Sequence, residues 1–141
     1  MKNYKAGIIG GIVAGIVFGM MMQMKGMMPV IAKMMGGSSV AFGWLIHMMI
    51  SIIFALMFVV LFGKKVVSWG SAIGYGIIEG VLTWIIGPLV VMPMMMGMSP
   101  FSNIDIMSLM THIMFGLILS IVYFKVLHHT HADGQTCMMC K

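Results

Sequence analysis

Two histidines inside long apolar stretches are the residues of this sequence best suited to chemistry, because imidazole binds transition metals and also relays protons. Each would lie about 10–12 Å inside one end of a helix, at a rise of about 1.5 Å per residue. An ionisable side chain at that depth in a membrane is a candidate for function. Each also lies on a face of small residues at four-residue spacing: Gly43, Ser51 and Ala55 beside His47, and Ser108, Gly116 and Ser120 beside His112. Two such rings could share a metal ion or hold a haem iron. They could also only join helices by hydrogen bonds, or serve a proton path.

Methionine sulfur is a second candidate ligand, because soft thioethers suit Cu(I). The chain has 22 methionines, and clusters follow the first and third apolar stretches. We expect an ion path to use Glu79 and the methionines of these clusters: Met24, Met27, Met28, Met94, Met95 and Met96. The alternative is that methionine only fills space as a flexible apolar side chain.

The C-terminal tail, residues 128–141, holds both cysteines of the chain in a C-x-x-C pair. This spacing indicates metal capture or thiol chemistry, and neighbouring histidines could add ligands. The candidate tail ligands are Cys137, Cys140, His128, His129 and His131. The sequence equally allows a solvated tail without order.

Glu79 is the only acidic residue deep inside an apolar stretch. Burial favours the neutral form of a carboxyl group, and Tyr75 and Thr83 lie one helical turn away on either side. Glu79 could therefore be satisfied locally, or it could neutralise a cation bound near the histidines.

The elements that position these residues are four predicted membrane spans. Hydrophobic residues make up 61% of the 141 residues and charged residues only 8%, whereas soluble domains have about 45–50% and 25%. Charge-free runs long enough to cross a bilayer, which takes about 20 residues, predict helices at about 6–24, 41–62, 68–92 and 104–126. Most lysines flank one side of these spans. The lysine bias therefore predicts that both termini face the cytoplasm of a bacterial-type inner membrane.

A shift of 65 residues relates the two halves of the chain, because it superposes Gly11 on Gly76, Gly15 on Gly80, and His47 on His112. We therefore predict an all-α membrane protein built as a tandem repeat of two helix pairs. The repeat units are about 6–62 and 71–127 within a transmembrane domain of residues 1–127. A parallel repeat implies a pseudo-two-fold axis along the membrane normal, and small residues four apart predict close helix packing.

Residues from about Ile46 to Phe124 resemble the YagU-type inner-membrane proteins. The resemblance rests on Ile46-His47, the Lys-Val-Val-Ser-Trp-Gly segment at 65–70, the Gly76/Gly80 face, Pro93, and Thr111-His112. The Gly87-Pro88-Leu89 and Met92-Pro93 segments are also similar to short bacterial four-span proteins. The resemblance implies a four-helix fold, a special status for both histidines, an association with acid tolerance and no enzymatic activity. The loops are shorter than in YagU, and the cysteine tail lies outside the shared pattern.

These features predict a non-enzymatic membrane protein that binds or transports a soft metal ion, with Cu(I) the favoured ion. His47 and His112 would be the ligands within the bundle, and Cys137 and Cys140 the cytoplasmic acceptors. A second interpretation is a b-type haem electron carrier with both histidines as axial ligands. A third is a structural or stress-related protein without a cofactor. The net charge of +5 follows from membrane topology and indicates no nucleic-acid partner. The small-residue faces leave a homodimer open.

Overall fold

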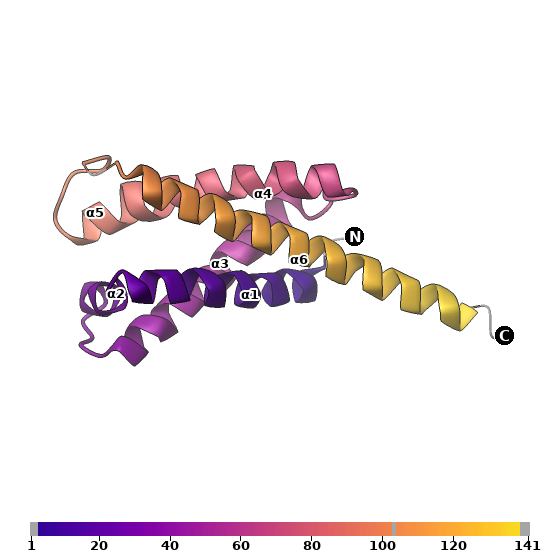
Figure 1. Ribbon diagram of the computed structural model, residues 1–141, viewed down its shortest axis with the longest axis horizontal. Coiled ribbons are helices and arrows are strands. Elements are labelled where there is room, and N and C mark those ends of the chain that lie inside the picture. The colour runs from indigo at the N-terminus through magenta and orange to yellow at the C-terminus, as the bar shows by residue number, and fades with distance from the viewer. Residues whose placement is uncertain (1–2, 103, 139–141) are drawn as a thin grey trace.

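The computed structural model describes residues 3–102 and 104–138, with the backbone alone for residues 129–138, and every regular element in this part of the chain is helical. Figure 1 shows α6 as the longest helix, which extends past the other helices toward the C-terminus. The helices are α1 (Tyr4–Met24), α2 (Met28–Met34), α3 (Val40–Phe62), α4 (Trp69–Trp84), η1 (Ile85–Val91), α5 (Met92–Met95) and α6 (Ile106–Met138).

Four of these helical stretches are long and apolar enough to cross a membrane, as the sequence predicts: Tyr4–Met24, Val40–Phe62, Trp69–Met95 and Ile106–His128. The observed ends fall within a few residues of the predicted ones. Each long helix begins at a side chain that accepts a backbone N–H of the first turn. These N-cap residues are Asn3, Ser39, Ser68 and Asp105.

Aliphatic side chains cover the outside of the bundle, where a soluble protein would carry charges. On α1 the glycine and alanine face is buried, while Ile9, Ile16 and Val17 on the opposite face are exposed. Exposed apolar surface of this extent marks contact with lipid or with another protein. The four long helices therefore pack inward through small residues and present large apolar residues outward.

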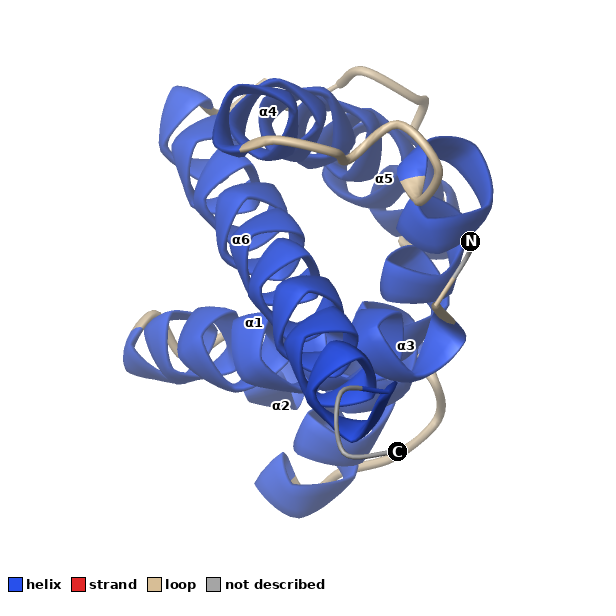
Figure 2. Cartoon of the chain, turned by 90° about the vertical axis from the view of Figure 1, so that its right-hand side faces the viewer, coloured by secondary structure: helices blue, strands red, loops and turns tan. Residues whose placement is uncertain are grey.

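The helices pack as two pairs that are joined on one side only. Helix α1 packs on α3, α4 packs on α6, and α6 also packs on α1, whereas α3 and α4 make only marginal contact. Figure 2 shows α6 running obliquely between α4 and α1. The histidine-bearing helices α3 and α6 thus lie diagonally across the bundle, and the side between α3 and α4 is largely open.

The outer connections differ between the two halves. After α1, the short helix α2 turns back and packs on α3. After α4, the helix instead continues through a π-helical segment, η1, which contains Pro88. Proline lacks an N–H group and clashes with the preceding turn of an α-helix, and the wider π turn accommodates it. The sequence predicts neither α2 nor the π segment.

The Tyr123 hydroxyl joins three distant segments at one end of the bundle. It donates a hydrogen bond to the Gly63 carbonyl oxygen at 3.2 Å and accepts one from the Asn3 N–H at 3.3 Å. We call this the lysine-rich end, because it carries Lys5, Lys64, Lys65 and Lys125. The opposite end carries α2, α5, Lys25 and Lys33, and we call it the methionine-rich end.

Candidate functional site

A cavity of about 470 Å³ occupies the half of the bundle nearer the methionine-rich end. All four long helices contribute to its wall, and it lies where α3 and α4 fail to pack. Its wall is largely aliphatic and aromatic, and the imidazoles of both His47 and His112 are part of it. The structure therefore brings the two candidate histidines to one cavity although their helices do not pack side by side.

One ring nitrogen of each histidine is fixed by a backbone carbonyl. His47 Nε2 lies 3.0 Å from the Gly15 carbonyl oxygen on α1, and His112 Nδ1 lies 2.7 Å from the Ser108 carbonyl oxygen of its own helix. A carbonyl only accepts, so these nitrogens carry the protons. The lone pairs are then on His47 Nδ1 and His112 Nε2, which have no hydrogen-bond partner among the described residues. Metal-binding histidines use this same arrangement, with the second nitrogen held by a carbonyl.

The Phe18 side chain of α1 touches both imidazoles. Its ring centroid lies 5.5 Å from that of His47 and 4.8 Å from that of His112, in tilted and edge-on geometries. The imidazole centroids are therefore no farther apart than the sum of these two distances. Any ligand bound by both imidazoles must therefore fit against the Phe18 ring or displace it. Phe18 was not predicted from the sequence, because an aromatic residue in a span usually indicates only packing.

The glycines of α1 and α4 set the positions of the histidines. A Cβ atom on Gly19 would lie 3.0 Å from Cδ2 of His47 and closer still to the Trp44 ring. A Cβ atom on Gly80 would lie 2.7 Å from the carbonyl oxygen of His112. These approaches confirm the prediction that the glycine faces pack helices closely, and they show that each histidine lies at such a contact.

Methionines from both clusters line the same cavity. They come from α1, α2, α5 and the adjoining segments: Met22, Met27, Met34, Met35, Met92 and Met95. Of the six methionines predicted for an ion path, only Met27 and Met95 are among them. Met28 is fully buried against α3, where it packs beside Gly43. The remaining three are exposed at the methionine-rich end: Met24, Met94 and Met96.

Glu79 is fully buried on α4, and neither carboxyl oxygen has a hydrogen-bond partner among the described residues. The predicted local partners are engaged elsewhere. The Thr83 hydroxyl donates to the Gly80 carbonyl oxygen at 3.0 Å, and the Tyr75 ring stacks on Phe62 with centroids 5.1 Å apart. The interpretation that Glu79 is satisfied locally is therefore wrong.

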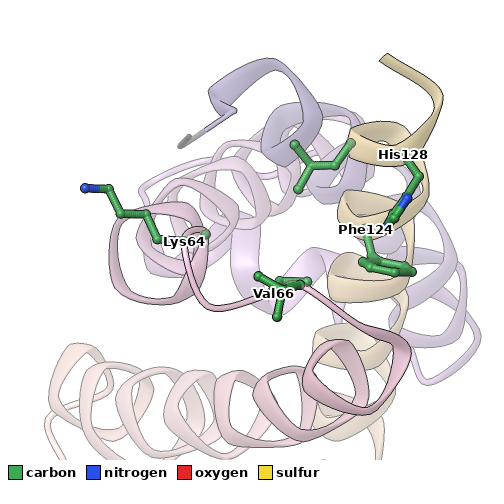
Figure 3. Close-up of a pocket in the computed structure, with 7 residues that line it drawn as sticks. Lys64, Val66, Phe124 and His128 are labelled. Carbon is green, nitrogen blue, oxygen red and sulfur yellow. The ribbon is translucent and has the colours of Figure 1, made fainter. Parts of the chain in front are cut away.

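The predicted tail ligands lie at the other end of the protein. His128 is exposed, and its ring packs edge-on against Phe124 with centroids 4.3 Å apart. Figure 3 shows His128 and Phe124 at a small pocket of about 230 Å³, with Lys64 pointing away from both. The side chains of His129, His131 and Cys137, and all of Cys140, lie outside the described part of the structure. Helix α6 itself continues without a break to Met138.

No three His, Cys, Asp or Glu side chains come together among the residues whose side chains the structure describes. A metal site in this part of the chain would therefore depend on imidazole and thioether ligands. In comparisons with known proteins, no protein-family model matches the sequence, and no curated protein or solved structure matches it significantly. The resemblance to YagU-type proteins thus stays a prediction.

Proposed function

We propose that this chain is an integral membrane protein whose cavity binds a soft monovalent metal ion, with Cu(I) as the favoured ion. The observation that carries the proposal is the convergence of two imidazoles and six methionine side chains on one cavity. Imidazole and thioether are ligands that Cu(I) accepts, and neither requires removal of a proton when the imidazole is neutral.

The lone pairs of the histidines provide the second argument. Both imidazoles already have one nitrogen engaged with a carbonyl, which leaves one free nitrogen on each ring at the cavity. A purely structural histidine in a membrane would gain by satisfying both nitrogens, since an unpaired polar group in an apolar medium is costly. The free nitrogens therefore favour a ligand-binding role.

The topology of the proposed protein follows from its lysines. Lys5, Lys64, Lys65 and Lys125 lie at the lysine-rich end, which would face the cytoplasm of a bacterial-type membrane by the positive-inside rule. The methionine-rich end would then face outward and recruit the ion. Cys137 and Cys140 would accept it on the cytoplasmic side.

Gene duplication is the proposed origin of the paired histidines. The α1–α3 and α4–α6 pairs correspond under the 65-residue shift, and in both pairs glycines of the first helix contact the histidine helix. A pseudo-two-fold axis would relate the pairs. The α1–α6 contact, which has no comparable counterpart between α3 and α4, departs from this symmetry.

Titration of the purified protein with Ag(I), a soft ion that resists redox change, tests the proposal. The thiolates would dominate binding, so the measurement uses a full-length variant with Cys137→Ser and Cys140→Ser, here called the cysteine-free variant. We expect this variant to bind the ion and to lose most of the binding when His47→Ala and His112→Ala are added. His128→Ala is the matched control, because His128 lies at the lysine-rich end, and it should retain the cavity site.

X-ray absorption at the metal edge should then report nitrogen and sulfur neighbours. Absence of binding in the cysteine-free variant, or binding that survives loss of both cavity histidines, would reject the metal site. A Soret band in the purified protein that is lost in the same double-histidine variant would instead establish the haem interpretation. If no metal or haem binds, the histidines have only a packing role.

A further inference from the structure

Glu79 is a buried acid whose position the packing of the bundle does not explain. Its side chain is fully buried in the middle of α4, and both carboxyl oxygens are unpaired among the described residues. Buried polar groups in folded proteins almost always have a hydrogen-bond partner, because leaving one unpaired costs free energy. A side chain retained under this penalty, in a place where an apolar residue would fit, indicates a role beyond packing.

Packing places Glu79 beside the cavity without making it part of the wall. The next residue, Gly80, lies against the backbone of His112 and Ile113, so Glu79 is at the level of His112 in the bundle. Thr83, one turn further along the same face of α4, is part of the cavity wall. Glu79 forms no three-residue cluster with the two histidines. It can therefore act on a bound cation through charge, but it does not coordinate the cation from this position.

Among the residues that the structure describes, none places a fixed positive charge beside Glu79. The titratable side chains of the spans around it are Tyr75 on its own helix, His47 on α3, and His112 and Tyr123 on α6. None of them forms a hydrogen bond or an ion pair with the carboxyl group. The described lysines lie in the connections or near the ends of the spans. A carboxylate ion in this position would be uncompensated, so the empty protein holds Glu79 as the neutral acid.

We propose that Glu79 is a proton site coupled to the cavity, and that it releases its proton when a soft cation binds to the histidines. This inference rests on the proposed function. The balance is simple: the cation enters, the Glu79 O–H bond breaks, and the proton leaves to solvent, so the net charge of the bundle is unchanged. No electron is transferred. The neutral imidazoles bind through lone pairs and release nothing.

The physical reason is the cost of placing a charge in an apolar medium. A monovalent cation bound by neutral ligands carries its full charge into the bundle, whereas a cation accompanied by a carboxylate leaves the site neutral. Coulomb attraction is weakly screened in such an interior, so the carboxylate need not touch the cation to stabilise it. Binding of the cation and loss of the proton thereby favour each other.

Proton counting during metal binding tests this coupling. Ag(I) is added to the cysteine-free variant at pH 7 in weak buffer, and the protons released are measured beside the Ag(I) bound. Binding and release of about one proton per ion is the expected result. The variant with Glu79→Gln should bind more weakly, so it is compared at saturating Ag(I), where it should release no protons. Glu79→Asp, which keeps the carboxyl group, should restore release.

Asp105 provides the matched control, because it is an acidic residue of the cavity wall itself. It is exposed and caps α6 through the N–H groups of Met107 and Ser108, and asparagine caps helices equally well. Asp105→Asn should therefore leave the proton count unchanged. Binding without proton release, or equal release with Glu79→Gln, would overturn the coupling while the metal site stands. Absence of Ag(I) binding would reject the proposed function and this inference with it.

Discussion

Replacement of Gly80 by alanine tests whether the close α4–α6 approach beside His112 holds the histidine site together. The added methyl group would lie 2.7 Å from the carbonyl oxygen of His112 and 2.9 Å from the amide nitrogen of Ile113, and still closer to the Ile113 Cα. All three atoms belong to the backbone of α6, so no side chain can turn away to make room. The two helices must separate, and His112 must move with α6.

The size of the effect follows from two opposing terms. Overpacking of a close contact costs about 1–3 kcal/mol, whereas the change from glycine to alanine within a helix gains about 1 kcal/mol. A substitution at Gly74 on the same helix allows the two energy terms to be measured separately. Gly74 is exposed, and no atom beyond its own stretch of helix lies within 4 Å of its added Cβ position. Gly74→Ala receives the helix gain alone. Gly80→Ala should therefore be less stable than Gly74→Ala by about 1–3 kcal/mol.

Reversible unfolding in mixed micelles, followed by circular dichroism as the fraction of denaturing detergent rises, measures this difference. Ag(I) titration of the same two variants on the cysteine-free background gives a second readout, in which only Gly80→Ala should weaken binding. Equal stability of the two variants would refute the packing argument. A destabilised Gly80→Ala protein with unchanged Ag(I) affinity would separate the α4–α6 contact from the site.

Three further substitutions have expected outcomes that the same unfolding assay measures. Ser120→Ala removes the 2.7 Å hydrogen bond from the Ser120 hydroxyl to the Ala72 carbonyl oxygen. It should lower the free energy of unfolding by about 0.6 kcal/mol, the average for such bonds in membranes. A change near zero would mean that the bond does not stabilise the fold. Tyr123→Phe removes two hydrogen bonds and should lower the free energy of unfolding by about 1 kcal/mol or more. The Asn3 amide should also exchange its hydrogen with solvent faster. An unchanged rate of amide exchange would contradict the role of the hydroxyl. Glu79→Leu removes an unpaired buried acid and should stabilise the fold by about 1–3 kcal/mol. It should also abolish the proton release that accompanies Ag(I) binding. A destabilised variant would show that the carboxyl group has a partner.

The spans were predictable because lipid imposes a simple requirement on sequence. Charge-free runs between Lys5 and Lys25 and between Lys33 and Lys64 cannot end within the bilayer, so their lengths fix the helices to within a few residues. The short helix α2 was missed because it lies outside any such run. The π segment was missed because Pro88 predicts a disturbed helix without specifying how the helix adjusts.

The candidate site was predictable only in part, for a reason that lies in its geometry. Small residues beside His47 and His112 indicate which helix faces approach closely, and the structure confirms close packing at both positions. They do not indicate which of the four sides of a bundle remains open. The cavity depends on the marginal α3–α4 contact, and the position of Phe18 against both imidazoles depends on the α1–α6 contact. Both features depend on how the two helix pairs assemble, and no local sequence pattern indicates that assembly.

The role of α6 in joining the bundle has a consequence for synthesis of the protein. Helix α6 packs on both α1 and α4, whereas α3 and α4 barely touch. It is also the last of the four spans to be made, because chains are synthesised from the N-terminus. Until it is inserted, α4 has no partner for its glycine face and Glu79 has no enclosing walls. Before α6 is inserted, the nascent protein therefore consists of the packed α1–α3 pair followed by α4, whose polar face is uncovered. The chain most needs the insertion machinery or a chaperone during the time between insertion of α4 and insertion of α6.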